Sequence, residues 1–190
     1  MKKILFGFFA VAVMAIASGS VSAQMMGGGN DNPMVGGAAM YKTKNIVENA
    51  VNSADHTTLV AAVKAAGLVD TLASKGPFTV FAPVNSAFDK LPAGTVETLL
   101  RPENKATLTK ILTYHVIAGN YSAKDVMGAI KKGNGKAEFT TVAGGKLWAM
   151  LDGKNVVLMD EKGSRSTVTI ADVKQSNGVI HVVDSVLLPN

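Results

Sequence analysis

The spacing of the apolar residues changes at Gly133, and this change limits the chain to a few fold classes. Before Gly133, apolar residues mostly recur every three or four positions, which is the period of one face of an α-helix. After it they alternate with polar residues in short runs, as in strands that bury one face. Residues 78–81, Phe-Thr-Val-Phe, are an early exception and predict a strand among the helices. Helices, one early strand, more helices and a β-meander indicate an α+β fold, with helices gathered against part of an antiparallel sheet assembly.

Caps and turns divide the chain into predicted elements. Asp55 is expected to cap a helix that ends at Gly67, and Ser122 with Asp125 has the spacing of a capping box. The predicted helices span residues 45–53, 55–66, 68–74, 86–90, 95–100, 103–113 and 122–131. The predicted strands span residues 78–81, 136–142, 146–151, 155–159, 165–173 and 179–187.

The first 23 residues have the pattern of a secretory signal peptide. Lys2 and Lys3 precede an uncharged apolar run over residues 4–17, and residues 21–23, Val-Ser-Ala, suit a signal peptidase. The run is shorter than the about 20 residues that cross a bilayer, so no transmembrane segment is expected in the mature chain. The mature protein is therefore expected to begin near Gln24 and to be exported, either to a periplasm or out of the cell.

Residues 24–40 are predicted to form a flexible tether before a domain over residues 41–190. The segment holds five glycines, one proline and four methionines without a periodic apolar face. Such a composition buries too little surface to offset the entropy of ordering the segment. Thioether sulfurs favour Cu(I), and copper binding by the methionines stays open as an alternative.

Composition limits the function classes. The chain has no cysteine, which excludes disulfides, thiolate metal sites and a lipid-modified cysteine. The net charge is +5, and removal of the two lysines of the signal peptide leaves +3. So small a charge, carried by scattered side chains, does not indicate a nucleic-acid-binding surface.

The sequence contains no recognisable catalytic motif. A G-x-S-x-G elbow, an S-x-x-K pair and a P-loop are all missing. The three histidines, His56, His115 and His181, lack the i, i+4 spacing of a helical metal pair. His56 is expected to be solvated in the first turn of a helix, whereas His115 and His181 continue apolar patterns and are expected to be buried. We therefore expect neither enzymatic activity nor a cofactor or bound metal.

Three segments carry a resemblance to a known family. They are residues 78–88 (FTVFAPVNSAF), residues 114–116 (YHV) and residues 177–189 (NGVIHVVDSVLLP). In this order and at these separations they resemble the fasciclin domain, and the resemblance covers residues 41–189. It implies a wedge-like antiparallel β-structure with packed helices in a secreted adhesion or interaction module.

The function that the resemblance implies is non-enzymatic binding of a protein or polysaccharide of the cell surface or matrix. The alternative is a periplasmic carrier or sensor of a small apolar ligand or a metal, which would use a groove between helices and sheet. The sequence leaves the identity of the partner and the oligomeric state open.

The resemblance also implies two partner-binding places. In animal adhesion relatives, an aspartate followed by an aliphatic residue precedes the Asn-Gly pair of the last segment, and the matching residues here are Asp172 and Val173. An acidic group beside an exposed aliphatic side chain on a turn can anchor a receptor. The second place is Tyr114 with His115. For both pairs, a purely structural role in a turn or in the core is the alternative.

Overall fold

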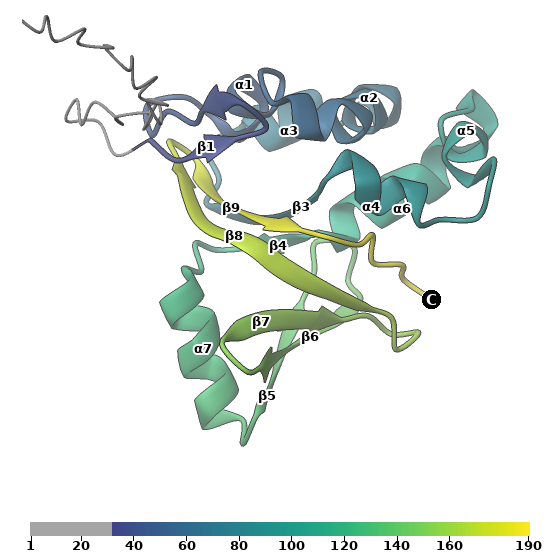
Figure 1. Ribbon diagram of the computed structural model, residues 1–190. Helices are drawn as coiled ribbons and strands as arrows, with labels where there is room; N and C mark the ends of the chain where they lie inside the picture. The colour runs from purple at the N-terminus through teal and green to yellow at the C-terminus, as the bar shows by residue number, and fades with distance from the viewer. Residues whose placement is uncertain (1–31) are drawn as a thin grey trace, which may run out of the picture. The chain divides into compact units, whose positions relative to one another are not determined.

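The computed structural model describes residues 32–190 (Figure 1). The predicted signal peptide and the first part of the predicted tether lie outside the described residues. The helices are α1 (Ile46–Ala50), α2 (Thr57–Ala66), α3 (Val69–Ala73), α4 (Asn85–Asp89), α5 (Thr95–Leu99), α6 (Lys105–Tyr114) and α7 (Ala123–Lys132). The strands are β1 (Met34–Val35), β2 (Ala38–Ala39), β3 (Phe78–Pro83), β4 (Val116–Ala118), β5 (Lys136–Thr140), β6 (Lys146–Asp152), β7 (Asn155–Met159), β8 (Arg165–Gln175) and β9 (Gly178–Val183). The 3₁₀ turns Ala54–His56 and Pro102–Asn104 lead into α2 and α6.

Strands β3 to β9 form one seven-stranded sheet in the order β4-β3-β9-β8-β7-β6-β5. Neighbouring strands run antiparallel except for β3 and β9, which run parallel. The α+β class with packed helices is confirmed, but the sheet is mixed rather than antiparallel throughout. The chain can return in the same direction because the segment between β3 and β9, which contains four helices, is long enough for a crossover.

The parallel pair depends on a close approach at Gly178. This glycine lies opposite Phe78, and a Cβ atom in its place would clash with the backbone oxygen of Phe78. The neighbouring Asn177 connects α1 and α3 to this part of the sheet. Its side-chain nitrogen donates to two backbone oxygens at the end of α3, each at 2.8 Å, and its Oδ1 accepts from the backbone N–H of Ile46 at 3.0 Å. The Asn-Gly pair therefore sets where α1 and α3 meet the sheet.

Two buried apolar clusters fill the domain. The first, here called the helical cluster, lies between α1–α6 and the sheet, and the second, the sheet cluster, includes side chains of α7 and of β5–β7. Successive side chains of a strand point to opposite faces. Accordingly, Val80 and Ala82 of β3 belong to the helical cluster and Phe81 belongs to the sheet cluster. Figure 1 shows the same division, with α1–α3 above β3 and β9, α4–α6 to the right of them, and α7 beside β5–β7.

The tether prediction is wrong for residues 34–40. Gly36 and Gly37 turn the chain with φ values of 56° and 75°, and β1 pairs with β2 as a hairpin. The hairpin brings Val35 and Met40 into the helical cluster, where each is 2% exposed. The glycines shape a tight turn that only residues without a Cβ atom adopt readily. The ordered domain thus begins before Tyr41.

Replacing Met40 by alanine should lower the free energy of unfolding by about 2–5 kcal/mol, because a buried side chain is removed from a packed core. Met34 in the same hairpin is 60% exposed, so Met34→Ala is the matched control and should change stability by less than about 0.5 kcal/mol. Urea unfolding followed by circular dichroism measures both variants. Equal effects would show that the hairpin does not pack on the domain.

Candidate functional site

Tyr114 lies at the end of α6 and ties that helix to the second half of the sheet. Its side chain is 0% exposed. The hydroxyl donates to the backbone oxygen of Lys146 at 2.5 Å and accepts from the backbone N–H of Glu161 at 3.2 Å. Burial raises the pKa of Tyr114 to about 12, although the hydrogen bond from Glu161 acts in the opposite direction. The hydroxyl therefore keeps the proton that it donates to Lys146.

His115 ties α6 to the C-terminal segment. Its Nδ1 lies 2.9 Å from the backbone oxygen of Ile111, and its Nε2 accepts from the backbone N–H of Leu187 at 3.0 Å. This pair of contacts requires a neutral ring with its proton on Nδ1. Burial lowers the pKa of His115, while the hydrogen bond to Ile111 acts against that shift. The prediction that His115 is a buried, hydrogen-bonded core residue is confirmed.

Asp172 and Val173 do not form the exposed turn that the resemblance implied. Asp172 lies at an irregularity of β8 with a φ of 60°. It is half-buried, and its Oδ1 accepts from the backbone N–H of Ala123, at the start of α7, at 2.7 Å. Val173 is 0% exposed and belongs to the helical cluster. The irregularity of the strand turns the valine inward, which is why the expectation of an exposed aliphatic side chain is wrong.

His181 of β9 joins the Asp172 region to the loop before α7. Its Nδ1 accepts from the backbone N–H of Asp172 at 3.3 Å, and its Nε2 lies 2.8 Å from the backbone oxygen of Tyr121. The ring also stacks on Phe81, with 5.6 Å between centroids. Burial lowers the pKa of His181, opposed by the hydrogen bond to Tyr121 and the charge of Asp172. The expected burial of His181 is confirmed.

His56 is buried, so the prediction that it is solvated is wrong. It is 3% exposed and lies in the 3₁₀ turn before α2. Its Nδ1 is 2.9 Å from the hydroxyl of Ser53, and its Nε2 has no hydrogen-bond partner among residues 32–190. Val35 and Met40 of the hairpin line a small pocket beside it. Burial lowers the pKa of His56. The sequence could not place this ring, because the residues that cover it were assigned to a tether.

The first sequence segment also has an internal role, through Asn85. Its Oδ1 accepts from the backbone N–H of Thr58 at 3.0 Å, and its Nδ2 donates to the backbone oxygen of Ala54 at 2.8 Å. The start of α2 is thus held by Asn85 and not by Asp55, which lies in the preceding 3₁₀ turn. Asparagine is a common partner of free N–H groups at helix starts, and here it comes from another helix.

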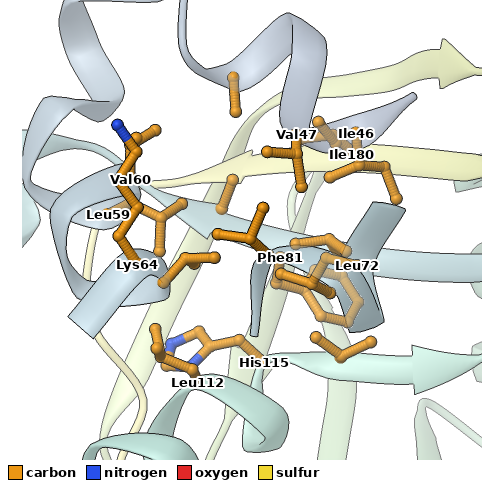
Figure 2. Close-up of a pocket in the computed structure, with 16 residues that line it drawn as sticks. Ile46, Val47, Leu59, Val60, Lys64, Leu72, Phe81, Leu112, His115 and Ile180 are labelled. Atoms are coloured by element: carbon orange, nitrogen blue, oxygen red, sulfur yellow. The ribbon is translucent and has the colours of Figure 1, made fainter. Parts of the chain in front are cut away.

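An apolar pocket of about 50 Å³ between the helices and the sheet is a candidate binding site (Figure 2). Figure 2 shows side chains of α1, α2, α3 and α6 around it, together with Phe81 of β3 and Ile180 of β9. Two of its lining residues are polar, namely His115 and Lys64. Both ring nitrogens of His115 are engaged elsewhere, whereas Lys64 is exposed. The pocket can take up an apolar group, and Lys64 is the one lining residue that carries a charge.

Among residues 32–190, no three histidine, aspartate or glutamate side chains come close enough together to hold a metal ion. Within the same residues, no helix combines the length and the apolar character that crossing a membrane requires.

The four predicted partner-binding residues therefore differ in accessibility. Tyr114 and His115 lie together at the end of α6, and Asp172 and Val173 lie on β8. The side chains of Tyr114, His115 and Val173 are at most 3% exposed. Only Asp172 presents a polar group at the surface, and a partner that touched the other three would have to open the core.

Comparison with known proteins gives a consistent result. A family model described as the fasciclin domain matches residues 54–189. The protein sll1483 of Synechocystis is 45% identical over 183 residues, which are 96% of this chain and 94% of that protein. The cell surface glycolipoprotein MPB83 of Mycobacterium bovis is 35% identical over 122 residues, which are 64% of this chain and 48% of that protein.

A solved structure shares the fold. It is a FAS1 domain pair from the insect cell adhesion molecule Fasciclin I, with a TM-score of 0.67 and 20% sequence identity. The match covers 76% of this chain and 51% of the domain pair. The chain thus shares the overall fold of that structure.

The three buried histidines should make the fold less stable below pH 6.5. Burial holds the pKa values of His56, His115 and His181 below their ordinary value of 6.5. Below pH 6.5 the unfolded chain therefore binds protons at these histidines that the folded chain does not bind. The neutral histidines contribute fully to the free energy of unfolding above pH 6.5. This contribution is lost as the pH falls from 6.5 towards the pKa values that the histidines have in the folded protein. At pH 5 the loss is at most about 2 kcal/mol per histidine.

Urea unfolding between pH 8 and pH 5 measures this loss. The window lies above the range in which carboxylates titrate, so the histidines dominate it. In the variant His181→Gln, the decline between pH 6.5 and pH 5 should be shallower than in the wild type. A free energy of unfolding that stays constant down to pH 5 would contradict the assignment of three neutral rings.

Proposed function

Because the chain belongs to the fasciclin domain family, we propose that it is an exported, non-enzymatic module that binds a protein or polysaccharide of the cell surface or matrix. The observation that carries this proposal is the family membership. One relative is named as a cell surface protein, and the solved structure with the same fold comes from a cell adhesion molecule. The residues that resemble a signal peptide, 1–23, support export to a periplasm or out of the cell.

Asp172 is the predicted partner-binding residue that remains accessible. One of its carboxylate oxygens caps α7 through Ala123, and the group is half-buried. A carboxylate held in this way loses little freedom when it binds, so it can orient a cationic group or a partner-bound metal ion. We propose that Asp172 contributes to the partner surface without its buried neighbour Val173.

The test compares binding to the cell envelope of the source organism. Asp172→Asn keeps an oxygen that can accept from Ala123 and tolerates the positive φ, while it removes the charge. Asp89→Asn, at the exposed end of α4, is the matched control. We expect the first variant to bind several-fold more weakly, in line with the loss of about 1 kcal/mol for one charged contact, and the control to bind as the wild type does.

Sedimentation of labelled protein with purified envelopes gives the affinities, and circular dichroism confirms equal folding. Equal binding by the two variants would remove Asp172 from the partner surface. A wild-type protein that does not bind envelopes or matrix would contradict the adhesive function itself.

The apolar pocket supports a second candidate function, which is carriage or sensing of a small apolar ligand. The pocket is lined almost wholly by aliphatic side chains of α1–α3, α6 and the sheet. Such pockets favour ligands without polar groups, because every polar group that enters would lose its hydration. The volume of about 50 Å³ limits the buried part of the ligand to a few heavy atoms.

Filling the pocket should abolish binding of an apolar probe. Val60 lines the pocket and is half-buried, so Val60→Phe should place a ring in it, whereas Val51→Phe at a position that is 48% exposed is the control. Displacement of a fluorescent apolar probe measures binding, and the expected loss in Val60→Phe is about tenfold or more, as for a lost buried apolar group. Unchanged probe binding in Val60→Phe would show that the pocket is only a packing space.

A further inference from the structure

One face of strands β5 to β8 is exposed or half-buried, except at Val157 of β7, which is 6% exposed. The other face of β5 and β6 carries Ala137, Phe139, Leu147 and Ala149, which belong to the sheet cluster together with two side chains of α7. Because side chains alternate along a strand, the residues between them point to the opposite side. Those on β5 and β6 are exposed or half-buried. We call this side of β5–β8 the outer face.

The strand register arranges the outer face in two rows that cross all four strands. The first row is Lys136, Met150, Val157 and Thr167. The second row is Glu138, Trp148, Met159 and Arg165. Each row has apolar side chains in its middle and a charged side chain at one end or both. Lys146 of β6 stands beside the second row, opposite Thr140.

Trp148 is the centre of a small polar network. Its ring nitrogen donates to Glu138 Oε2 at 3.1 Å, and the ammonium group of Lys136 lies 4.5 Å from the centre of its ring. Lys146 Nζ pairs with the other oxygen of Glu138 at 3.0 Å. The contacts with Lys146 and Trp148 lower the pKa of Glu138, so the carboxylate stays ionised. These contacts hold the indole on the surface in a defined orientation.

The outer face carries more positive than negative charge. Its cations are Lys136, Lys146 and Arg165, and its carboxylates are Glu138, which is already paired with Lys146, and Asp152 at the end of β6. Within residues 32–190, no carboxylate lies within ion-pair distance of Lys136 or Arg165. An anionic partner would therefore meet two cations that have not been neutralised by the protein.

Resting on the proposed function, we infer that the outer face binds an acidic polysaccharide, with a sugar ring on Trp148 and anionic groups on Lys136 and Arg165. A sugar ring offers an apolar C–H face that packs on an indole, and acidic sugars add carboxylate or sulfate groups at its edge. A polymer laid along a row meets a new strand about every 4.8 Å, which is close to the length of one sugar unit. The apolar side chains of the outer face can pack against the C–H face of a sugar, and the cations beside them can pair with its anionic groups.

An acidic segment of a protein is the competing partner. Such a segment would use the cations but has no need of the indole, since its carboxylates sit on flexible side chains. The fixed ring of Trp148, opposite Met159 in the strand register, therefore favours the polysaccharide.

Trp148 reports on its own site, because it is the only tryptophan in the chain. We would titrate the full chain with polygalacturonate and follow tryptophan fluorescence and its quenching by iodide. The expected result is a saturable spectral shift with protection from iodide, and no shift with neutral dextran. Polyglutamate of equal charge serves as the protein-like competitor. If it binds as tightly and shifts the spectrum equally, the inference is overturned in favour of an acidic protein partner.

The double variant Lys136→Gln/Arg165→Gln keeps the reporter and removes two cations. It should bind polygalacturonate about tenfold more weakly, a change of about 1.4 kcal/mol, because two exposed charge contacts are lost. Lys42→Gln/Arg101→Gln removes the same charge from two exposed positions outside the outer face and should change the affinity less than about twofold. Equal losses in the two double variants would overturn the inference, because only net charge would then matter.

The envelope assay separates this inference from the proposed function. If the wild type binds envelopes and Lys136→Gln/Arg165→Gln binds them equally well, the adhesive function stands and the outer face is not its site. If the double variant loses both polygalacturonate and envelope binding while its fold is intact, the outer face is the contact surface.

Discussion

The parallel pairing of β3 with β9 is the constraint on which the rest of the domain depends. It is possible only where Gly178 leaves room for the backbone oxygen of Phe78. On one side of this pair the helical cluster is held in place by Asn177, which binds the end of α3 and the start of α1. On the other side of the pair, Phe81 and Val183 belong to the sheet cluster. A side chain at position 178 would separate the strands and, with them, both clusters.

Several residues in the segments that carry the family resemblance connect distant parts of the domain. Asn85, Tyr114 and His115 each join segments that are distant in the chain through backbone hydrogen bonds. Such roles leave few atoms of these side chains for a partner. A partner therefore has to contact groups that these hydrogen bonds do not occupy. Such groups are the carboxylate of Asp172, the mouth of the apolar pocket and the outer face of β5–β8.

Two of the buried histidines, His115 and His181, also connect segments that are distant in the chain. Each of His115 and His181 has one ring nitrogen that accepts from a backbone N–H, and this contact exists only in the neutral ring. His115 holds the C-terminal segment against α6, and His181 holds the bulge of β8 beside the start of α7. Proton uptake would therefore act first on the connections between elements, and less on the helices and strands themselves.

Local pattern alone determined most helices and strands, the capping box of Ser122 and Asp125, and the burial of His115. These features depend on neighbours within about one helical turn or two strand positions, which the sequence shows directly. Tertiary structure alone decided the parallel direction of β9, the packing of residues 34–40, the burial of His56, and the inward turn of Val173. It also decided the alignment of Trp148 with Lys136 and Arg165 on one face. Each of these depends on contacts between residues far apart in the chain, such as Asn177 with Leu72, and no local repeat of apolar residues encodes which distant segments will meet.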